Sequence, residues 1–90
     1  MSADSRTPFE HVNAALAQLK EMRHYAKNNA ENLTAQWLLF DGELKKLGQT
    51  ERIESLMMRQ SELHDALAEE IDALEELAVT LQPPPEPESA

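Results

Sequence analysis

The 90-residue chain has no cysteine, only two glycines and only four aromatic residues. Without cysteine, a disulfide scaffold and a thiolate metal site are excluded, which agrees with a reducing compartment. A long hydrophobic run is also missing. No stretch approaches the ~20 apolar residues that cross a bilayer, and residues 1–10 contain no apolar segment of a secretory signal. We therefore expect a cytoplasmic protein without a membrane partner.

Basic residues are scarce in the second half of the chain, and the net charge is −9. Residues 1–48 carry six acids and six bases, whereas residues 49–90 carry eleven acids and only Arg52 and Arg59. Such a surface cannot neutralise a row of phosphates, so direct binding to nucleic acid is disfavoured. We define an acidic face on the second half by the residues Glu62, Asp65, Glu69, Asp72 and Glu76.

Apolar residues recur in alternating steps of three and four from residue 9 to residue 47. This spacing keeps one stripe of a helix against a partner helix. Together with abundant Ala, Leu, Glu and Gln, it predicts an all-α chain. Eleven of the twelve stripe positions are apolar, and Arg23 is the exception. The predicted seam of the first helix contains Phe9, Val12, Leu16, Leu19, Arg23, Ala26, Ala30, Leu33, Trp37, Phe40, Leu44 and Leu47.

The first helix is predicted over residues 8–47. Thr7 is a suitable N-cap, with proline at the first helical position and Glu10 completing a capping box. Gly48 would end the helix in a left-handed conformation. Asn28-Asn29 are poor helix formers and Asp41-Gly42 is typical of a turn, but the stripe keeps its phase across both, so we favour one continuous helix. The alternative is a break near Asn28-Asn29 or at Asp41-Gly42.

A turn at residues 48–50 and a second helix over residues 51–81 complete a predicted antiparallel helical hairpin, with Thr50 as the second N-cap. Residues 1–6 are expected to form a flexible arm. Three consecutive prolines should end the second helix before a disordered tail at residues 83–90.

The second helix carries its own stripe, predicted at Ile53, Leu56, Gln60, Leu63, Leu67, Glu70, Leu74, Leu77 and Leu81, and widened alongside by Met57, Ile71 and Ala78. If the chain folds back at the three-residue turn, residues that face each other across the hairpin have numbers that sum to about 98. Trp37 would then lie over Gln60, and Phe9 and Val12 would extend beyond the second helix. The polar seam residues Arg23, Gln60 and Glu70 are expected to fix the register of the two helices.

One seam between two helices buries little apolar surface for a chain of this length. We therefore expect two hairpins to form a homodimeric four-helix bundle.

Residues 24–33, His-Tyr-Ala-Lys-Asn-Asn-Ala-Glu-Asn-Leu, resemble the phosphorylatable segment of histidine phosphotransfer domains. The matching positions are His24, Lys27, Ala30, Asn32 and Leu33. The resemblance implies a four-helix bundle and an exposed histidine, His24, that accepts a phosphoryl group. The family's small glycine after the lysine is Asn28 in this chain.

Other pairs of titratable residues predict no catalytic or metal site. Glu21 and His24 have the Glu-x-x-His spacing of di-iron carboxylate bundles, but both flank the seam and no second such pair exists. His64 and Asp65 lack a nucleophile at a suitable spacing and a glycine-rich loop. We therefore expect no enzyme, no metal and no cofactor.

The segment Trp37-Leu38-Leu39-Phe40 is apolar all round the helix, although the seam needs only Trp37 and Phe40. Leu38 and Leu39, with Met58 across the hairpin, therefore form a predicted docking patch beside Trp37, or an extra layer of self-association.

We expect a non-catalytic protein-binding module that dimerises and docks a protein partner, such as an adaptor, a chaperone-like subunit, a regulator or an inhibitor. One alternative is a phosphotransfer module that uses His24. The other is an acidic inhibitor of phage type, which would occupy the nucleic-acid site of its target through the acidic face.

Overall fold

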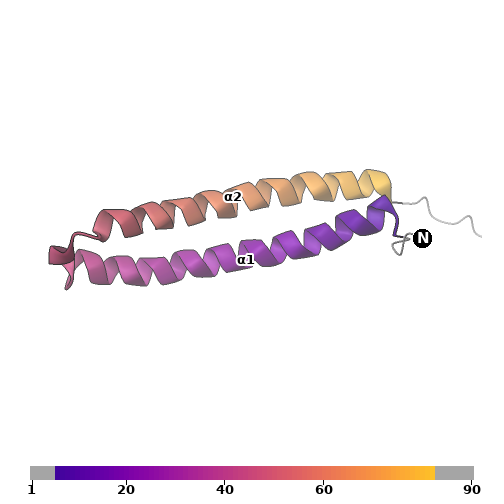
Figure 1. Ribbon diagram of the computed structural model, residues 1–90. Coiled ribbons are helices and arrows are strands. Elements are labelled where there is room, and N and C mark those ends of the chain that lie inside the picture. The colour runs from indigo at the N-terminus through magenta and orange to yellow at the C-terminus, as the bar shows by residue number, and fades with distance from the viewer. Residues whose placement is uncertain (1–5, 83–90) are drawn as a thin grey trace, which may run out of the picture.

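The computed structural model describes residues 6–82 and consists of two long helices that run antiparallel and side by side (Figure 1). Helix α1 spans Pro8–Asp41 and helix α2 spans Thr50–Leu81. The connection, which contains the short 3-10 helix η1 (Lys45–Leu47), is called the closed end. The open end is where α1 begins and α2 ends.

Residues 6–82 contain no strand, so the predicted all-α helical hairpin is confirmed. The predicted tail and all of the predicted arm except Arg6 lie outside the described residues.

Helix α1 begins as predicted. The Glu10 N–H donates a 3.2 Å hydrogen bond to the Thr7 hydroxyl, and proline occupies the first turn. The Thr7 hydroxyl in turn donates to the Glu10 carboxylate at 3.3 Å. Threonine therefore satisfies one of the amide groups that have no partner within the helix.

Helix α1 continues through Asn28-Asn29 but ends at Asp41, six residues before the predicted end at Leu47. Gly42 still donates its N–H to the Leu38 carbonyl at 3.1 Å, but its φ of −102° and ψ of −97° are not helical. A Cβ at this position would lie 3.1 Å from the Leu38 oxygen, so glycine allows the chain to leave the helix here. The prediction of an unbroken helix to Leu47 is wrong, and the break at Asp41-Gly42 is confirmed.

The closed end is held by a left-handed glycine and a hydroxyl group. Gly48 has φ 68° and ψ 30°, but it closes η1 rather than α1. Gln49, and not Thr50 as predicted, is the N-cap residue of α2, and it makes no side-chain capping bond. The Thr50 hydroxyl instead donates a 2.7 Å hydrogen bond to the Phe40 carbonyl at the end of α1. It thereby satisfies a carbonyl group at a helix terminus, where intrahelical donors run out.

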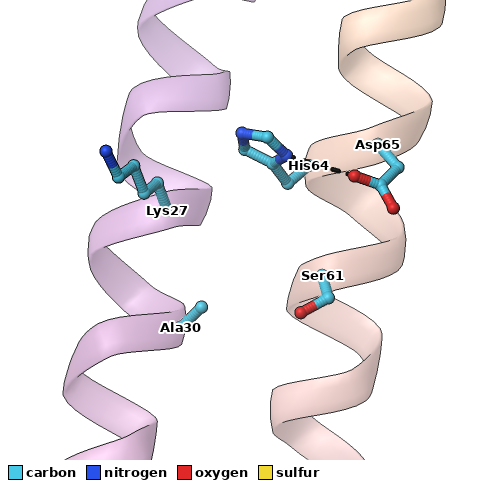
Figure 2. A pocket seen from close by; sticks show the side chains of 5 residues that line it. All are labelled: Lys27, Ala30, Ser61, His64 and Asp65. Carbon is cyan, nitrogen blue, oxygen red and sulfur yellow. Dashed lines mark hydrogen bonds and ion pairs between the residues drawn. The ribbon is translucent and has the colours of Figure 1, made fainter.

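The two helices are shifted by about seven positions from the predicted register. Lys27 lies opposite His64 and Ala30 lies opposite Ser61, so facing residues have numbers that sum to about 91 rather than about 98 (Figure 2). The shift arises because residues 42–49 connect the helices, where a turn of three residues was predicted. Seven residues are one heptad, so the shift by itself keeps the stripe of α1 facing α2. The predicted placement of Trp37 over Gln60 is wrong for the same reason.

The seam is most tightly packed towards the open end. Every predicted seam position of α1 from Phe9 to Phe40 is buried or half-buried, including Arg23. Phe9 and Val12 pack against the buried side chains of Leu16, Ile71 and Ala78, so the predicted overhang of the first helix is absent.

The half of the seam near the closed end is looser. Among the described residues from 27 to 65, none is fully buried. Two buried polar atoms there, the indole nitrogen of Trp37 and the side-chain oxygen of Gln60, have no hydrogen-bond partner.

The hydrogen bond from Thr50 to Phe40 gives a stability prediction. Replacing Thr50 by Val should lower the free energy of unfolding by about 1 kcal/mol, because a part-buried carbonyl loses its donor. Urea unfolding at fixed protein concentration measures the change. Thr34→Val is the matched control, since the Thr34 hydroxyl bonds to Ala30 within an exposed stretch of α1 and its loss should cost less than about 0.5 kcal/mol. Equal losses in the two variants would contradict the proposed role of Thr50.

Candidate functional site

Helix α2 faces α1 with a stripe that differs from the predicted one at every second position. The predicted residues Ile53, Gln60, Leu67, Leu74 and Leu81 are buried or half-buried. Between them, the seam contains Met57, His64, Ile71 and Ala78, whereas the predicted Leu56, Leu63, Glu70 and Leu77 are exposed. Ile71 is 1% exposed and Leu63 is 48% exposed. The predictions that Leu63 and Glu70 lie in the seam are therefore wrong for the hairpin.

The choice between the two stripes has a physical reason. A seam through Glu70 would bury a carboxylate, which is costly without a partner. The observed seam buries Ile71 instead and leaves His64 partly exposed, with its Nδ1 3.3 Å from the Asp65 carboxylate. As a result, Leu56, Leu63 and Leu77 form a second apolar stripe that α1 does not cover.

The two sides of the hairpin are distinguished by an ion pair. Lys20 Nζ lies 3.3 Å from Glu75 Oε2, and this contact joins the helices along one side, which we call the charged side. At 100° per residue, Met22 lies across the α1 seam from Lys20, and Leu77 lies across the α2 seam from Glu75. Because Lys20 and Glu75 share one side of the hairpin, Met22 and Leu77 share the other.

We call this other surface the low-charge face. All its residues are exposed, and only Arg59 and Glu70 are charged. Helix α1 contributes Ala15, Gln18, Met22, Tyr25, Asn29, Asn32, Gln36 and Leu39, and helix α2 contributes Leu56, Arg59, Leu63, Ala66, Glu70, Ala73 and Leu77.

Large apolar side chains gather on the low-charge face. Of the ten large hydrophobic residues that are exposed within the described chain, six belong to it: Met22, Tyr25, Leu39, Leu56, Leu63 and Leu77. Extended apolar surface of this kind usually marks a contact. The sequence contained the signal, because charges are missing from these helical positions, but it could be recognised only once the seam of α2 was known.

The acidic face lies on the outer surface of α2. All five of its residues, Glu62, Asp65, Glu69, Asp72 and Glu76, are exposed. Arg59 lies on the low-charge face, and Arg52, one heptad earlier, falls at the same helical position. The five residues of the acidic face and the two bases of α2 therefore occupy different sides of the helix, whereas Glu70 shares the side of the bases.

A hollow of about 370 Å³ opens between the helices on the charged side, lined by Lys27, Ala30, Ser61, His64 and Asp65 (Figure 2). The small side chains of Ala30 and Ser61 leave this space. Ser61 is a residue that the sequence analysis missed, although its spacing of three from His64 places both on one side of α2.

Serine, histidine and aspartate are the residue types of a hydrolytic triad, but this hollow lacks the geometry of one. His64 contacts Asp65, whereas no hydrogen bond joins Ser61 to His64 in the described structure. The surrounding backbone N–H groups belong to a continuous α-helix and are used in its own hydrogen bonds, so they cannot stabilise an oxyanion.

His24, the candidate phosphoryl acceptor, is exposed on α1. The Asn28 side-chain nitrogen lies 3.3 Å from His24 Nε2, and the Tyr25 ring packs edge-on against the imidazole with centroids 6.0 Å apart. Asn28 stands where the phosphotransfer motif has a small glycine, and its side chain covers one of the two ring nitrogens. The described residues form two helices per chain, whereas the resemblance implied a bundle of four.

The predicted docking patch at the closed end is divided between the two sides of the hairpin. Leu39 lies on the low-charge face, whereas Leu38 follows Lys27 by eleven residues, or about three turns, and lies on the charged side. Met58 is also on the charged side, where it lines a shallow groove together with Met57 and three carboxylates. Trp37 is half-buried in the seam.

The described residues contain no group of three His, Asp or Glu side chains that could hold a metal ion. Over the same range, neither helix combines the length and apolar character needed to cross a bilayer. Comparison with protein-family models, with curated proteins and with solved structures gives no match.

The surroundings of His24 give a second prediction. We expect a phosphorylated receiver domain to transfer no phosphoryl group to the protein, because Asn28 obstructs the imidazole. Intact-mass spectrometry detects a phosphoryl adduct, and Asn28→Gly shows whether removing the obstruction allows transfer. Transfer to the wild-type chain that His24→Gln abolishes would contradict this expectation and favour the phosphotransfer function.

Proposed function

We propose that the chain is a non-catalytic helical protein-binding module, an adaptor, chaperone-like subunit or regulator, that docks a protein partner on the charged side near its closed end. One observation carries the proposal: Leu38, Leu47 and Met58 are each at least 60% exposed in this short region. Covering such a side chain contributes about 1.5–3 kcal/mol, so a partner gains affinity by binding here.

The groove beside Met58 indicates the chemistry of the partner. Methionine is flexible and polarisable, so Met57 and Met58 can adapt to apolar side chains of different shapes. Glu54, Glu62 and Asp65 border the same groove. A segment that presents apolar residues flanked by Lys or Arg therefore fits this surface.

Dimerisation is the second part of the proposed function. A hairpin of two helices has only one line of contact as its core, and ten large hydrophobic residues stay exposed within residues 6–82. Pairing two hairpins into a four-helix bundle would cover many of them.

A second candidate function is occupation of a basic nucleic-acid site on a target protein. The observation that favours it is the separation of charge on α2, whose five-residue acidic face contains no base. Salt distinguishes the two candidates. Added salt screens the attraction between exposed charges, with a screening length of ~8 Å at physiological ionic strength, so binding of this second kind weakens as the salt concentration rises. Glu69→Lys with Glu76→Lys should abolish binding of this second kind.

The docking surface is tested by changing the closed end alone. Leu38→Glu combined with Met58→Glu should abolish retention of a partner that a photo-crosslinker at Glu62, which borders the groove, captures from cell extract, while helix content stays unchanged. Val79→Glu is the matched control, because Val79 is 71% exposed and occupies the same helical position as Met58, three heptads later. Affinity purification followed by mass spectrometry reads out the result. Loss of the same partner in both proteins would contradict docking at the closed end.

A further inference from the structure

We propose that the low-charge face is the surface through which two copies of this chain pair, with α2 packed antiparallel on α2 of the second copy. The inference deepens the dimer proposed above by naming its interface and its orientation, and it rests on that proposal.

The low-charge face has the dimensions of a stable interface. It extends over residues 15–39 of α1, a length of about 36 Å at 1.5 Å per residue. Two adjacent helices whose axes lie 8–10 Å apart present a strip roughly 20 Å wide. The footprint is therefore about 700 Å² per copy, close to the ~800 Å² per partner that stable protein interfaces bury.

The hairpin also needs cover on this face. The smallest dimension of the Cα trace is 15 Å, so the hairpin is a single layer of helices. Only five hydrophobic residues of the described chain are fully buried. A second layer placed on the low-charge face would turn the exposed stripe of Leu56, Leu63 and Leu77 into a core between layers, as in four-helix bundles.

The distribution of charge identifies a second copy as the partner. The chain has a net charge of −9, yet Arg59 and Glu70 are the only charged residues of this face and they balance each other. Two copies that meet face to face keep their acidic faces on the outside, where water and salt screen the repulsion. A strongly basic partner would be attracted to the acidic face instead.

The orientation follows from matching the chemistry of the two layers. A two-fold axis across the helices places α2 on α2, so that Leu56 and Leu63 lie among the leucines and alanines of the second copy. The same arrangement brings Arg59 of one copy within one helical turn of the level of Glu70 of the other. A two-fold axis along the helices would place α2 on α1 and set the leucine stripe against Asn29, Asn32 and Gln36.

Overlap of the two hairpins is largest when the axis passes near the middle of α2, close to Ala66. This small residue is exposed on the low-charge face. In the proposed dimer, the two copies of Ala66 therefore lie next to each other. In the alternative with α2 on α1, they lie on different helices of the bundle and are separated by more than the ~7 Å between Cα atoms that a disulfide allows.

Leu63→Glu tests the interface. It should raise the dissociation constant of the dimer at least 100-fold, so that light scattering gives the 10.2 kDa monomer at concentrations where the wild type gives about twice that mass. Val79→Glu adds the same charge on the other side of α2 and should leave the dimer intact. Circular dichroism checks that both variants are helical. A dimer that Leu63→Glu leaves unchanged would overturn the inference alone, whereas a monomeric wild type would overturn the dimer and the inference together.

Single cysteines test the orientation, since the natural chain has none. In a glutathione redox buffer, Ala66→Cys should become a disulfide-linked dimer almost completely. Asp72→Cys, on the acidic face of the same helix, should stay reduced. Failure of Ala66→Cys to cross-link in a protein that light scattering shows to be dimeric would overturn the antiparallel contact between the α2 helices. Equal cross-linking of both variants would indicate random collision and also overturn it.

Discussion

The contact between two helices can cover only one stripe on each of them, and the rest of the structure depends on this limit. Helix α1 has one well-defined apolar stripe and uses it for the hairpin. Helix α2 has two neighbouring stripes, one residue apart, and α1 can cover only the one that contains Ile71. The stripe that stays outside determines where the molecule still has apolar surface to bury.

Charge follows the same division. The Lys20–Glu75 ion pair and the groove bordered by carboxylates lie on one side of the hairpin, whereas the low-charge face on the opposite side has Arg59 and Glu70 as its only charged residues. The surface proposed for self-association and the surface proposed for a different protein thus lie on different sides of this chain of 90 residues. The acidic outer surface of α2 also favours solubility, because it repels other copies that approach from that side.

Much of the fold could be predicted because α1 contains unambiguous local signals. Thr7 and Pro8 mark its start, and the alternating steps from Phe9 to Phe40 identify its buried side, including the half-buried Arg23. The closed end could not be predicted in the same way, because Gly42 and Gly48 are both plausible stops and the stripe keeps its phase across Gly42 as far as Leu47. The resulting error of one heptad did not change which side of α1 faces α2, so nothing in the stripe of α1 exposed it. The low-charge face was missed because Leu63 and His64 are alternative seam positions, and the choice between them depends on packing along the whole of α2.

The uneven packing of the seam has a consequence for how the hairpin opens. All fully buried side chains of the described structure, including Ile71 and Ala78, lie from the middle of the hairpin towards the open end, whereas the unpartnered atoms of Trp37 and Gln60 lie towards the closed end. We therefore expect the free energy of local opening to be lower beside the connection than around Leu16 and Ile71. Amide hydrogens near Phe40 and Ile53 should exchange with solvent sooner than those near Leu16 and Ile71. The loosest part of the seam is thus the part beside Leu38 and Met58, where the docking surface is proposed.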